Sequence, residues 1–218
     1  MSIVSQPAVT QPLALVPPAI DQPPVRYEEP TRKRWTREEY YRLDEQGWFQ
    51  NQRVELIDGE IVQLSPQSPQ HAAAAERVRR ILDRTFGEGY WVRHQSSLVH
   101  GDYSEPEPDI AVVRGEIEDF STQHPTSSIL IVEVSRTSLA YDKNRKLHLY
   151  ASMGVPEYWI LDLNSRRLLV YREPVAEASA PFGFSYAKAM MLSEPEIVSP
   201  LEKPSAKIEV STMLPSKT

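Results

Sequence analysis

Two carboxylates stand out as residues whose types and settings suggest chemistry. Asp109 follows Pro108 at the head of a predicted strand, and Glu133 lies inside the apolar run Ile-Leu-Ile-Val-Glu-Val. A glutamate in such a strand is costly to bury unless its charge is paired or binds a metal ion. If the two strands are neighbours, the two side chains can hold a hard cation such as Mg²⁺ or Mn²⁺. A structural ion pair, or a strand end that faces solvent, is the alternative for Glu133.

A lysine belongs to a second pattern. Asp142, Lys146 and Tyr150 recur at intervals of four residues, so they share one face of a predicted helix. A lysine on that face could reach the carboxylates, where it could neutralise charge on a phosphate or position an attacking water. The alternative is a solvated salt bridge beside a half-buried tyrosine.

Glu55 and His71 are weaker candidates. Glu55 lies between Val54 and Leu56 on a predicted hairpin, so it faces away from both, and either a solvated glutamate or a site residue fits that position. His71 falls in the first turn of a predicted helix, where a capping or solvated histidine is the favoured interpretation. The chain has no Walker A loop, GxGxxG, GxSxG or HExxH motif, and its five histidines lack the spacing of a zinc site.

The elements that must position these side chains follow from local patterns. A capping box at Thr36 begins a first helix, Asp58-Gly59 is a hairpin turn, and Ser68-Pro69 begins a second helix with one apolar stripe. The expected helices span residues 36–46, 69–86 and 139–153, and the expected hairpin spans 53–64. The expected strands span residues 90–100, 109–114, 129–135, 158–162, 167–171 and 207–210.

This order of elements predicts an α/β (α+β) fold. Its core is a helix, three strands, a helix and a strand, preceded by an N-terminal helix and hairpin and followed by a short C-terminal strand. The nearly continuous apolar run 129–134 indicates a strand covered on both faces, in the middle of the sheet. Residues 1–33 are rich in Pro, Gln and Ala without apolar periodicity, which predicts a disordered tail before a domain spanning residues 34–214.

Composition bounds the class of protein. A chain of 218 residues, 40% of them hydrophobic, suits one domain with its own core. The absence of cysteine excludes disulfides and thiolate catalysis and fits a reducing cytosol. No stretch approaches the roughly 20 apolar residues that cross a bilayer, and no secretory signal is visible, so we expect a cytoplasmic protein without a membrane partner. The net charge of −6 argues against a strong nonspecific nucleic-acid binder, although a cleft that holds cations must itself be acidic.

Taken together, these motifs resemble the Uma2 family, also catalogued as DUF820. The resemblance extends over residues 35–214, and the run Gly-Val-Pro-Glu-Tyr-Trp is its most distinctive part. It is carried by Val54-Glu-Leu-Ile-Asp-Gly-Glu60, Ser65-Pro66, Ser68-Pro-Gln-His71, Pro108-Asp109, Ile131-Val-Glu-Val-Ser135, Asp142-x-x-x-Lys146-x-x-x-Tyr150-Ala151, Gly154-Val-Pro-Glu-Tyr-Trp159 and Asp162.

The resemblance implies a restriction-endonuclease-like protein of the PD-(D/E)XK nuclease superfamily, with an αβββαβ core and Mg²⁺- or Mn²⁺-dependent hydrolysis of phosphodiester bonds in DNA. Asp109 then corresponds to the PD aspartate and Glu133 to the second acid, both as metal ligands and catalytic residues. Two residues later the superfamily has lysine, whereas this chain has Ser135. Lys146 from the following helix is the expected catalytic substitute, and Lys143 is the alternative.

Glu55 is expected to complete the catalytic set by joining the cation shell, directly or through water. The rival interpretation is the same fold kept as a binding or self-associating module with little or no nuclease chemistry, which the acidic charge and the missing Glu-x-Lys motif favour. Besides nucleic acid, a second copy of the chain is an expected partner, in a homo-oligomer. Convergence of Asp109, Glu133 and Lys146 on one open cleft would favour the enzyme. Glu133 sealed in the core against an arginine would favour the rival.

Overall fold

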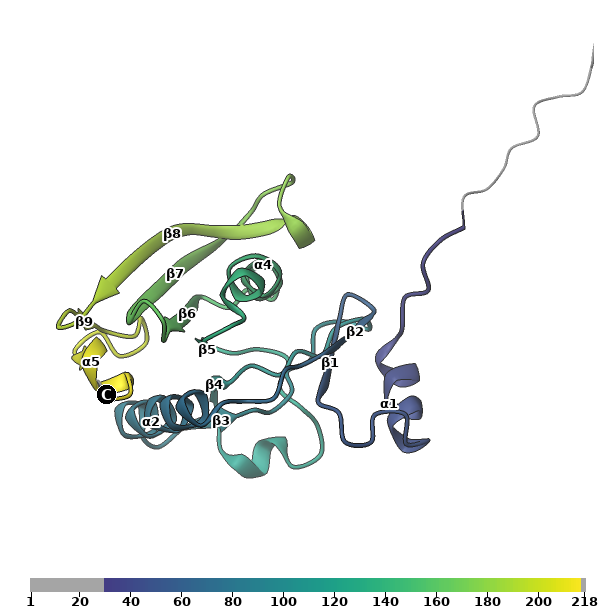
Figure 1. Ribbon diagram of the computed structural model, residues 1–218, viewed down its shortest axis with the longest axis horizontal. Helices are drawn as coiled ribbons and strands as arrows, with labels where there is room; N and C mark the ends of the chain where they lie inside the picture. The colour runs from purple at the N-terminus through teal and green to yellow at the C-terminus, as the bar shows by residue number, and fades with distance from the viewer. Residues whose placement is uncertain (1–29, 217–218) are drawn as a thin grey trace, which may run out of the picture. The chain divides into compact units, whose positions relative to one another are not determined.

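The computed structural model describes residues 30–216, and its central element is a mixed six-stranded sheet (Figure 1). The strands lie in the order β3 (Tyr90–His94), β4 (Ile110–Arg114), β5 (Leu130–Ser135), β6 (Glu157–Asp162), β7 (Arg167–Ala176) and β8 (Phe184–Ser193). Strands β5 and β6 run parallel, and the other neighbouring pairs in this sheet are antiparallel. A parallel pair needs a crossover connection, and helices between β5 and β6 supply it.

Two helical layers and several short elements complete the domain. The longer helices are α1 (Arg37–Glu45) and α2 (Pro69–Phe86), and the crossover consists of α3 (Leu139–Tyr141), the π-helical turn η2 (Asp142–Lys146) and α4 (Leu147–Ser152). The remaining elements are β1 (Val54–Ile57), β2 (Glu60–Gln63), η1 (Ile117–Phe120), η3 (Pro181–Gly183), β9 (Ile197–Val198), β10 (Ile208–Glu209) and α5 (Val210–Met213). The run α2, β3, β4, β5, crossover, β6 is the predicted αβββαβ order.

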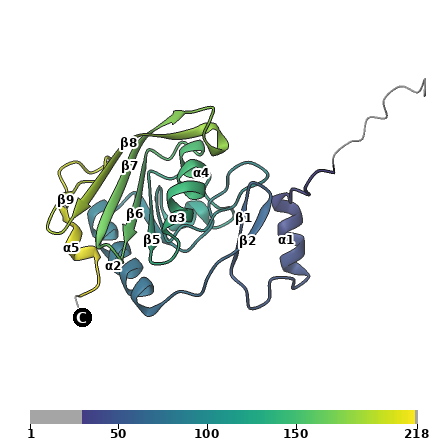
Figure 2. The ribbon, with the colours of Figure 1, turned by 45° about the horizontal axis from the view of Figure 1, so that its top comes forward.

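The sheet is covered on both faces, with α2 on one side and the crossover on the other (Figures 1 and 2). On the α2 side, Val78 packs in one buried cluster with Val132 of β5. On the crossover side, Ile131 of β5 packs in a second cluster with Leu147. Neighbouring residues of a strand point to opposite faces, so all six residues of β5 are buried. The apolar run therefore marks a strand covered on both faces, as predicted.

The predicted helix starts and the hairpin turn are confirmed. Thr36 caps α1, with its hydroxyl accepting from the Glu39 N–H and the Glu39 carboxylate accepting from the Thr36 N–H. Ser68 caps α2 and is followed by Pro69 at the first helical position. Strands β1 and β2 pair around Asp58-Gly59, where both residues have the positive φ that such a tight turn requires.

Two predicted elements differ from the structure. One strand is shorter than predicted, and one helix contains a π-helical turn. The predicted strand 90–100 ends at His94, because Gln95 adopts a φ of 47° and leaves the extended conformation. The predicted helix 139–153 contains the π-helical turn η2, which inserts one residue into the helical spacing without leaving a compositional mark.

The C-terminal third contains the largest differences from the sequence-based expectation. Strand β7 continues to Ala176 and pairs with β8, which was not predicted. Strand β8 lies at the edge of the sheet and shows no alternation of buried and exposed residues, so it lacks the period-two signal of a half-buried strand. The predicted strand 207–210 shrinks to β10, and α5 begins at Val210.

The predicted disordered tail, residues 1–33, lies mostly outside the described residues. From Lys33 onward the described chain forms one compact unit. Among the helices between residues 30 and 216, none has the length and apolar character needed to cross a membrane.

Candidate active site

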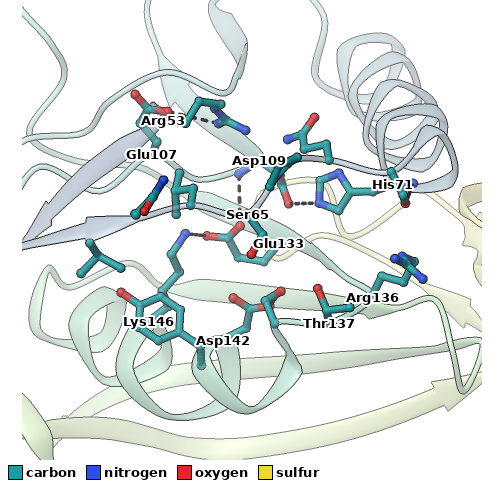
Figure 3. Close-up of a pocket in the computed structure, with 18 residues that line it drawn as sticks. Arg53, Ser65, His71, Glu107, Asp109, Glu133, Arg136, Thr137, Asp142 and Lys146 are labelled. Carbon is teal, nitrogen blue, oxygen red and sulfur yellow. Dashed lines mark hydrogen bonds and ion pairs between the residues drawn. The ribbon is translucent and has the colours of Figure 1, made fainter. Parts of the chain in front are cut away.

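A pocket of about 340 Å³ opens between the α2 N-terminus, the end of β2 and the start of the crossover. It gathers charged side chains from segments that are far apart in the sequence. Its acidic, basic and histidine lining residues are Arg53, His71, Glu107, Asp109, Glu133, Arg136, Asp142 and Lys146. Three of the four residues proposed as catalytic from the sequence are therefore in one open pocket (Figure 3).

Asp109 and Glu133 meet because their strands pair. The register of β4 and β5 sets Ile110 opposite Val132, and the next residue on each side is Asp109, directly before β4, and Glu133, within β5. The Asp109 N–H donates a hydrogen bond to Glu133 Oε2 over 3.2 Å. The Val134 N–H donates in return to Asp109 Oδ2 over 2.8 Å. Backbone N–H donors therefore hold the two carboxyl groups next to each other.

Lys146 reaches Glu133, as its helix face suggested, and Tyr150 binds the same carboxyl group. The Lys146 ammonium donates to Glu133 Oε1 over 2.9 Å, and the Tyr150 hydroxyl donates to the same oxygen over 2.7 Å. Lys143, the alternative lysine, is exposed and does not line the pocket. Lys146 is thus the lysine that the π-helical turn delivers to the carboxylates.

Glu55 lies behind Lys146 rather than in the pocket. Its side chain is 0% exposed, and its Oε2 is 3.3 Å from the Lys146 ammonium. The same oxygen accepts from the Glu107 N–H over 3.1 Å, and the Tyr141 hydroxyl donates to Oε1 over 3.4 Å. Lys146 therefore lies between the carboxylates of Glu55 and Glu133, a buried arrangement in which one cation faces two anions.

His71 is a pocket residue that the sequence reasoning undervalued. Its backbone N–H donates to the Ser68 hydroxyl at the start of α2, but its ring does not face solvent. The ring Nε2 lies 3.1 Å from Asp109 Oδ2, and the side chain is 14% exposed. The expectation of a capping or solvated histidine is wrong for the side chain. No local signal could separate the two outcomes, because Asp109 is 38 residues away.

The pKa values of the Asp109 and Glu133 carboxyl groups are shifted in opposite directions. Burial raises the pKa of Glu133 to about 8, although the Lys146 ammonium acts to lower it, and the charges of Asp109 and Asp142 add to the increase. Burial also acts to raise the pKa of Asp109, but His71, the Val134 N–H and Lys146 outweigh it, and this pKa lies below its usual range. The Asp109 carboxyl group therefore loses its proton more readily than the Glu133 carboxyl group.

Lys146 and Asp142 complete this charge network. Burial acts to lower the pKa of Lys146, but the carboxylates of Glu133, Glu55 and Asp142 raise it well above its ordinary value. Lys146 is therefore charged. Burial raises the pKa of Asp142, although Lys146 and a hydrogen bond from the Ser138 hydroxyl act to lower it.

The oxygen donors of this pocket fit a hard divalent cation. Asp109 Oδ1 accepts no hydrogen bond from any residue in the described part of the chain, and Glu133 Oε2 accepts one, so both keep lone pairs for a metal. Within residues 30–216, no three acidic, histidine or cysteine side chains form a ready cage. Mg²⁺ does not require one, because it is often held by one or two carboxylates with water and phosphate in its other positions.

A known structure shares the fold of this chain. The structure is similar to one described as "Crystal structure of a putative nuclease belonging to DUF820 from Anabaena variabilis", with a TM-score of 0.58 and 15% identity. The match covers 73% of this chain and 88% of that one, and at this identity it shows the fold alone. No curated protein matches the chain. Residues 37–202 match the Uma2 family, whose description is "Putative restriction endonuclease". That span contains the pocket carboxylates and both of their strands, and the chain belongs to the Uma2 family.

Proposed function

We propose that this chain is a Mg²⁺- or Mn²⁺-dependent endonuclease that hydrolyses phosphodiester bonds in DNA. The observation that carries the proposal is the approach of Asp109, directly before β4, to Glu133 of β5, at an open pocket that Lys146 also lines. The resemblance to the PD-(D/E)XK superfamily assigns metal binding to these same two carboxylates. The membership of a family described as restriction endonucleases points to nucleic acid as the substrate.

Asp109 and Glu133 would hold the cation. A bound Mg²⁺ or Mn²⁺ would lower the pKa of a coordinated water and stabilise the charge that develops on the phosphate. The free Oδ1 of Asp109 and the remaining lone pair of Glu133 Oε2 are the oxygens available for this role. His71 would orient the Asp109 carboxylate through its ring Nε2 and keep it ionised, since hydrogen bonds to a charged form favour that form.

The main role of Lys146 would be to hold Glu133. With its ammonium between two carboxylates and its side chain 5% exposed, it offsets negative charge beneath the cation and holds Glu133 in place. Glu55 would therefore act as a positioning residue for Lys146, rather than as a member of the cation shell. Tyr150 holds Glu133 Oε1 from the same helix face.

A cleavage assay tests the proposal directly. The purified chain is incubated with supercoiled plasmid, linear duplex, single-stranded DNA and RNA, in Mg²⁺, in Mn²⁺ and in EDTA. We expect cleavage of DNA that requires the metal and that falls at least a hundredfold in Asp109→Asn, since this change removes one of two metal-binding charges. Cleavage of equal rate by Asp109→Asn, or cleavage that persists in EDTA, would reject the proposal.

The rival function is a nuclease-fold module that binds or self-associates without cleavage. One observation favours it, namely that Lys146 is already paired with two carboxylates, so its charge is not free for a phosphate. Glu133 is not sealed against an arginine, however, and Asp109 and Glu133, the carboxylates proposed to bind the metal, both line an open pocket. DNA binding without cleavage under every metal condition would select the rival.

A further inference from the structure

The cations of the pocket differ in how far they are already paired. The pocket is lined by four acids and three strong bases, Arg53, Arg136 and Lys146. Lys146 is 2.9 Å from Glu133 and 3.3 Å from Glu55. The Arg53 guanidinium lies 3.2 Å from the Glu107 carboxylate. These two bases are therefore engaged with acids of the protein itself.

Arg136 is the base that remains. It is exposed, and its side chain has no ion pair or hydrogen bond with any residue between 30 and 216. Its backbone is nevertheless anchored, because its carbonyl accepts from Asn164 Nδ2 over 2.6 Å. Arg136 comes three residues after Glu133 and directly after β5, so the strand that carries the buried carboxylate also places this guanidinium at the pocket.

Arg136 and Lys146 lie in different parts of the pocket. Lys146 approaches Glu133 from one side, whereas Arg136 lies on the other side, the side on which His71 and the α2 N-terminus are found (Figure 3). The N-terminal end of a helix carries partial positive charge, which favours an anion there. A guanidinium presents paired N–H donors in a planar geometry that matches the oxygens of a phosphate.

We infer that Arg136 binds a phosphate group of the substrate strand that flanks the bond to be cut. The inference rests on the proposed nuclease function and adds a contact that the metal-binding carboxylates cannot make. The carboxylates are at the buried floor of the pocket, so the bond to be cut is expected there. Arg136 is exposed, so it meets the strand where the strand leaves the pocket. In a chain of net charge −6, an unpaired cation at this position offsets the repulsion between the acidic pocket and a polyanion.

The test compares Arg136→Gln with Arg136→Lys and with Arg84→Gln as a matched control. Arg84 is an exposed arginine on α2, about 20 Å along the helix from His71, so its replacement removes the same charge away from the pocket. A fluorescent 20-base-pair duplex of mixed sequence serves as the probe. Its Kd is measured in EDTA over a series of salt concentrations, and kcat and KM for cleavage are measured in Mg²⁺.

If Arg136 contacts a flanking phosphate, replacing it should weaken the binding of DNA. Arg136→Gln should raise Kd and KM about tenfold or more, leave kcat within about twofold, and reduce the slope of log K against log salt by about 0.9. Arg136→Lys should recover part of the loss, because the charge returns without the paired geometry. Arg84→Gln should match the unmodified chain within about twofold.

The outcomes separate the inference from the function on which it rests. If the unmodified chain cleaves the duplex and Arg136→Gln behaves like Arg84→Gln, the inference is overturned and the nuclease function stands. A fall in kcat alone, with KM and the salt slope unchanged, would also overturn it, since the contact would then be made only in the transition state. If the unmodified chain neither binds nor cleaves the duplex, both proposals fail together. Thermal melts of each variant verify that the fold is intact.

Discussion

Asp109 directly precedes β4 and lies beside Glu133 of the neighbouring strand β5, and the Asp109 N–H donates to Glu133 Oε2 over 3.2 Å. The backbone of one acid thus orients the side chain of the other. The Val134 N–H donates in turn to Asp109 Oδ2 over 2.8 Å, so backbone donors hold the two carboxyl groups next to each other. Substitutions of these two acids and of the residues that contact them test the roles proposed for the pair.

Mg²⁺ or Mn²⁺ should stabilise the native chain through this pair. A cation that binds only the folded state raises its stability by about 2.7 kcal/mol at a hundredfold excess over Kd. Thermal melts with and without metal should therefore differ for the unmodified chain and coincide for Asp109→Ala. Glu107→Gln is the matched control, because Glu107 also lines the pocket but is paired with Arg53, and it should keep the metal shift. An equal shift in Asp109→Ala would place the metal elsewhere.

The pH dependence of the stability of the chain without metal should follow the titration of Glu133. Its pKa is raised from 4.5 to about 8 in the folded chain by burial, so the native state holds this proton more tightly than the unfolded state. The stability that this proton contributes is fully present below about pH 4.5 and is lost as the pH rises through about 8. Melts without metal, run between pH 5 and pH 9, should show this decline.

A cation competes with the same proton, so the Mg²⁺-induced rise in Tm should grow as the pH approaches 8. Glu133→Gln has no proton to lose at this position, and it should flatten both trends. A decline of equal size in Glu133→Gln would assign the pH dependence to another group.

Replacing Lys146 should damage the fold as well as activity. The ammonium offsets two buried carboxylates, and removing one partner of a buried charge cluster costs about 3–5 kcal/mol. Lys146→Met should lower the free energy of unfolding in urea by an amount of this order. Lys143→Ala, at an exposed position, should change it by less than about 0.5 kcal/mol.

A double variant shows whether the loss arises from uncompensated charge. Glu55→Gln together with Lys146→Met leaves fewer unpaired charges than Lys146→Met alone, so it should be the more stable of the two. If the double variant is no more stable than the single one, Lys146 stabilises the fold through packing and not through Glu55.

His71 should matter for metal affinity. Its ring holds Asp109 Oδ2 at 3.1 Å, and loss of a residue that orients a metal ligand commonly costs 10–100-fold in affinity, so we expect about tenfold or more. His71→Ala should raise the Kd for Mn²⁺ measured by calorimetry while leaving the melting temperature without metal within a few degrees. An unchanged Kd would show that Asp109 needs no support from His71.

Much of the framework follows from local sequence. The caps at Thr36 and Ser68 and the Asp58-Gly59 turn are short-range signals, because the groups that bond lie within a few residues of one another. The apolar run of β5 identifies a strand covered on both faces, and a glutamate inside it identifies a charge that needs a partner. The candidate carboxylates and the lysine on the next helix were therefore open to prediction.

The partners of those side chains were decided by tertiary structure. Glu55 is 91 residues from Lys146 and His71 is 38 residues from Asp109, and no local pattern encodes contacts over such separations. The hairpin glutamate became a buried counterion and the helix histidine a support for Asp109 because packing of β1 and α2 against the core brought them there. Strand β8 escaped prediction for a related reason: an edge strand has little buried surface, so it carries little of the apolar alternation by which strands are identified.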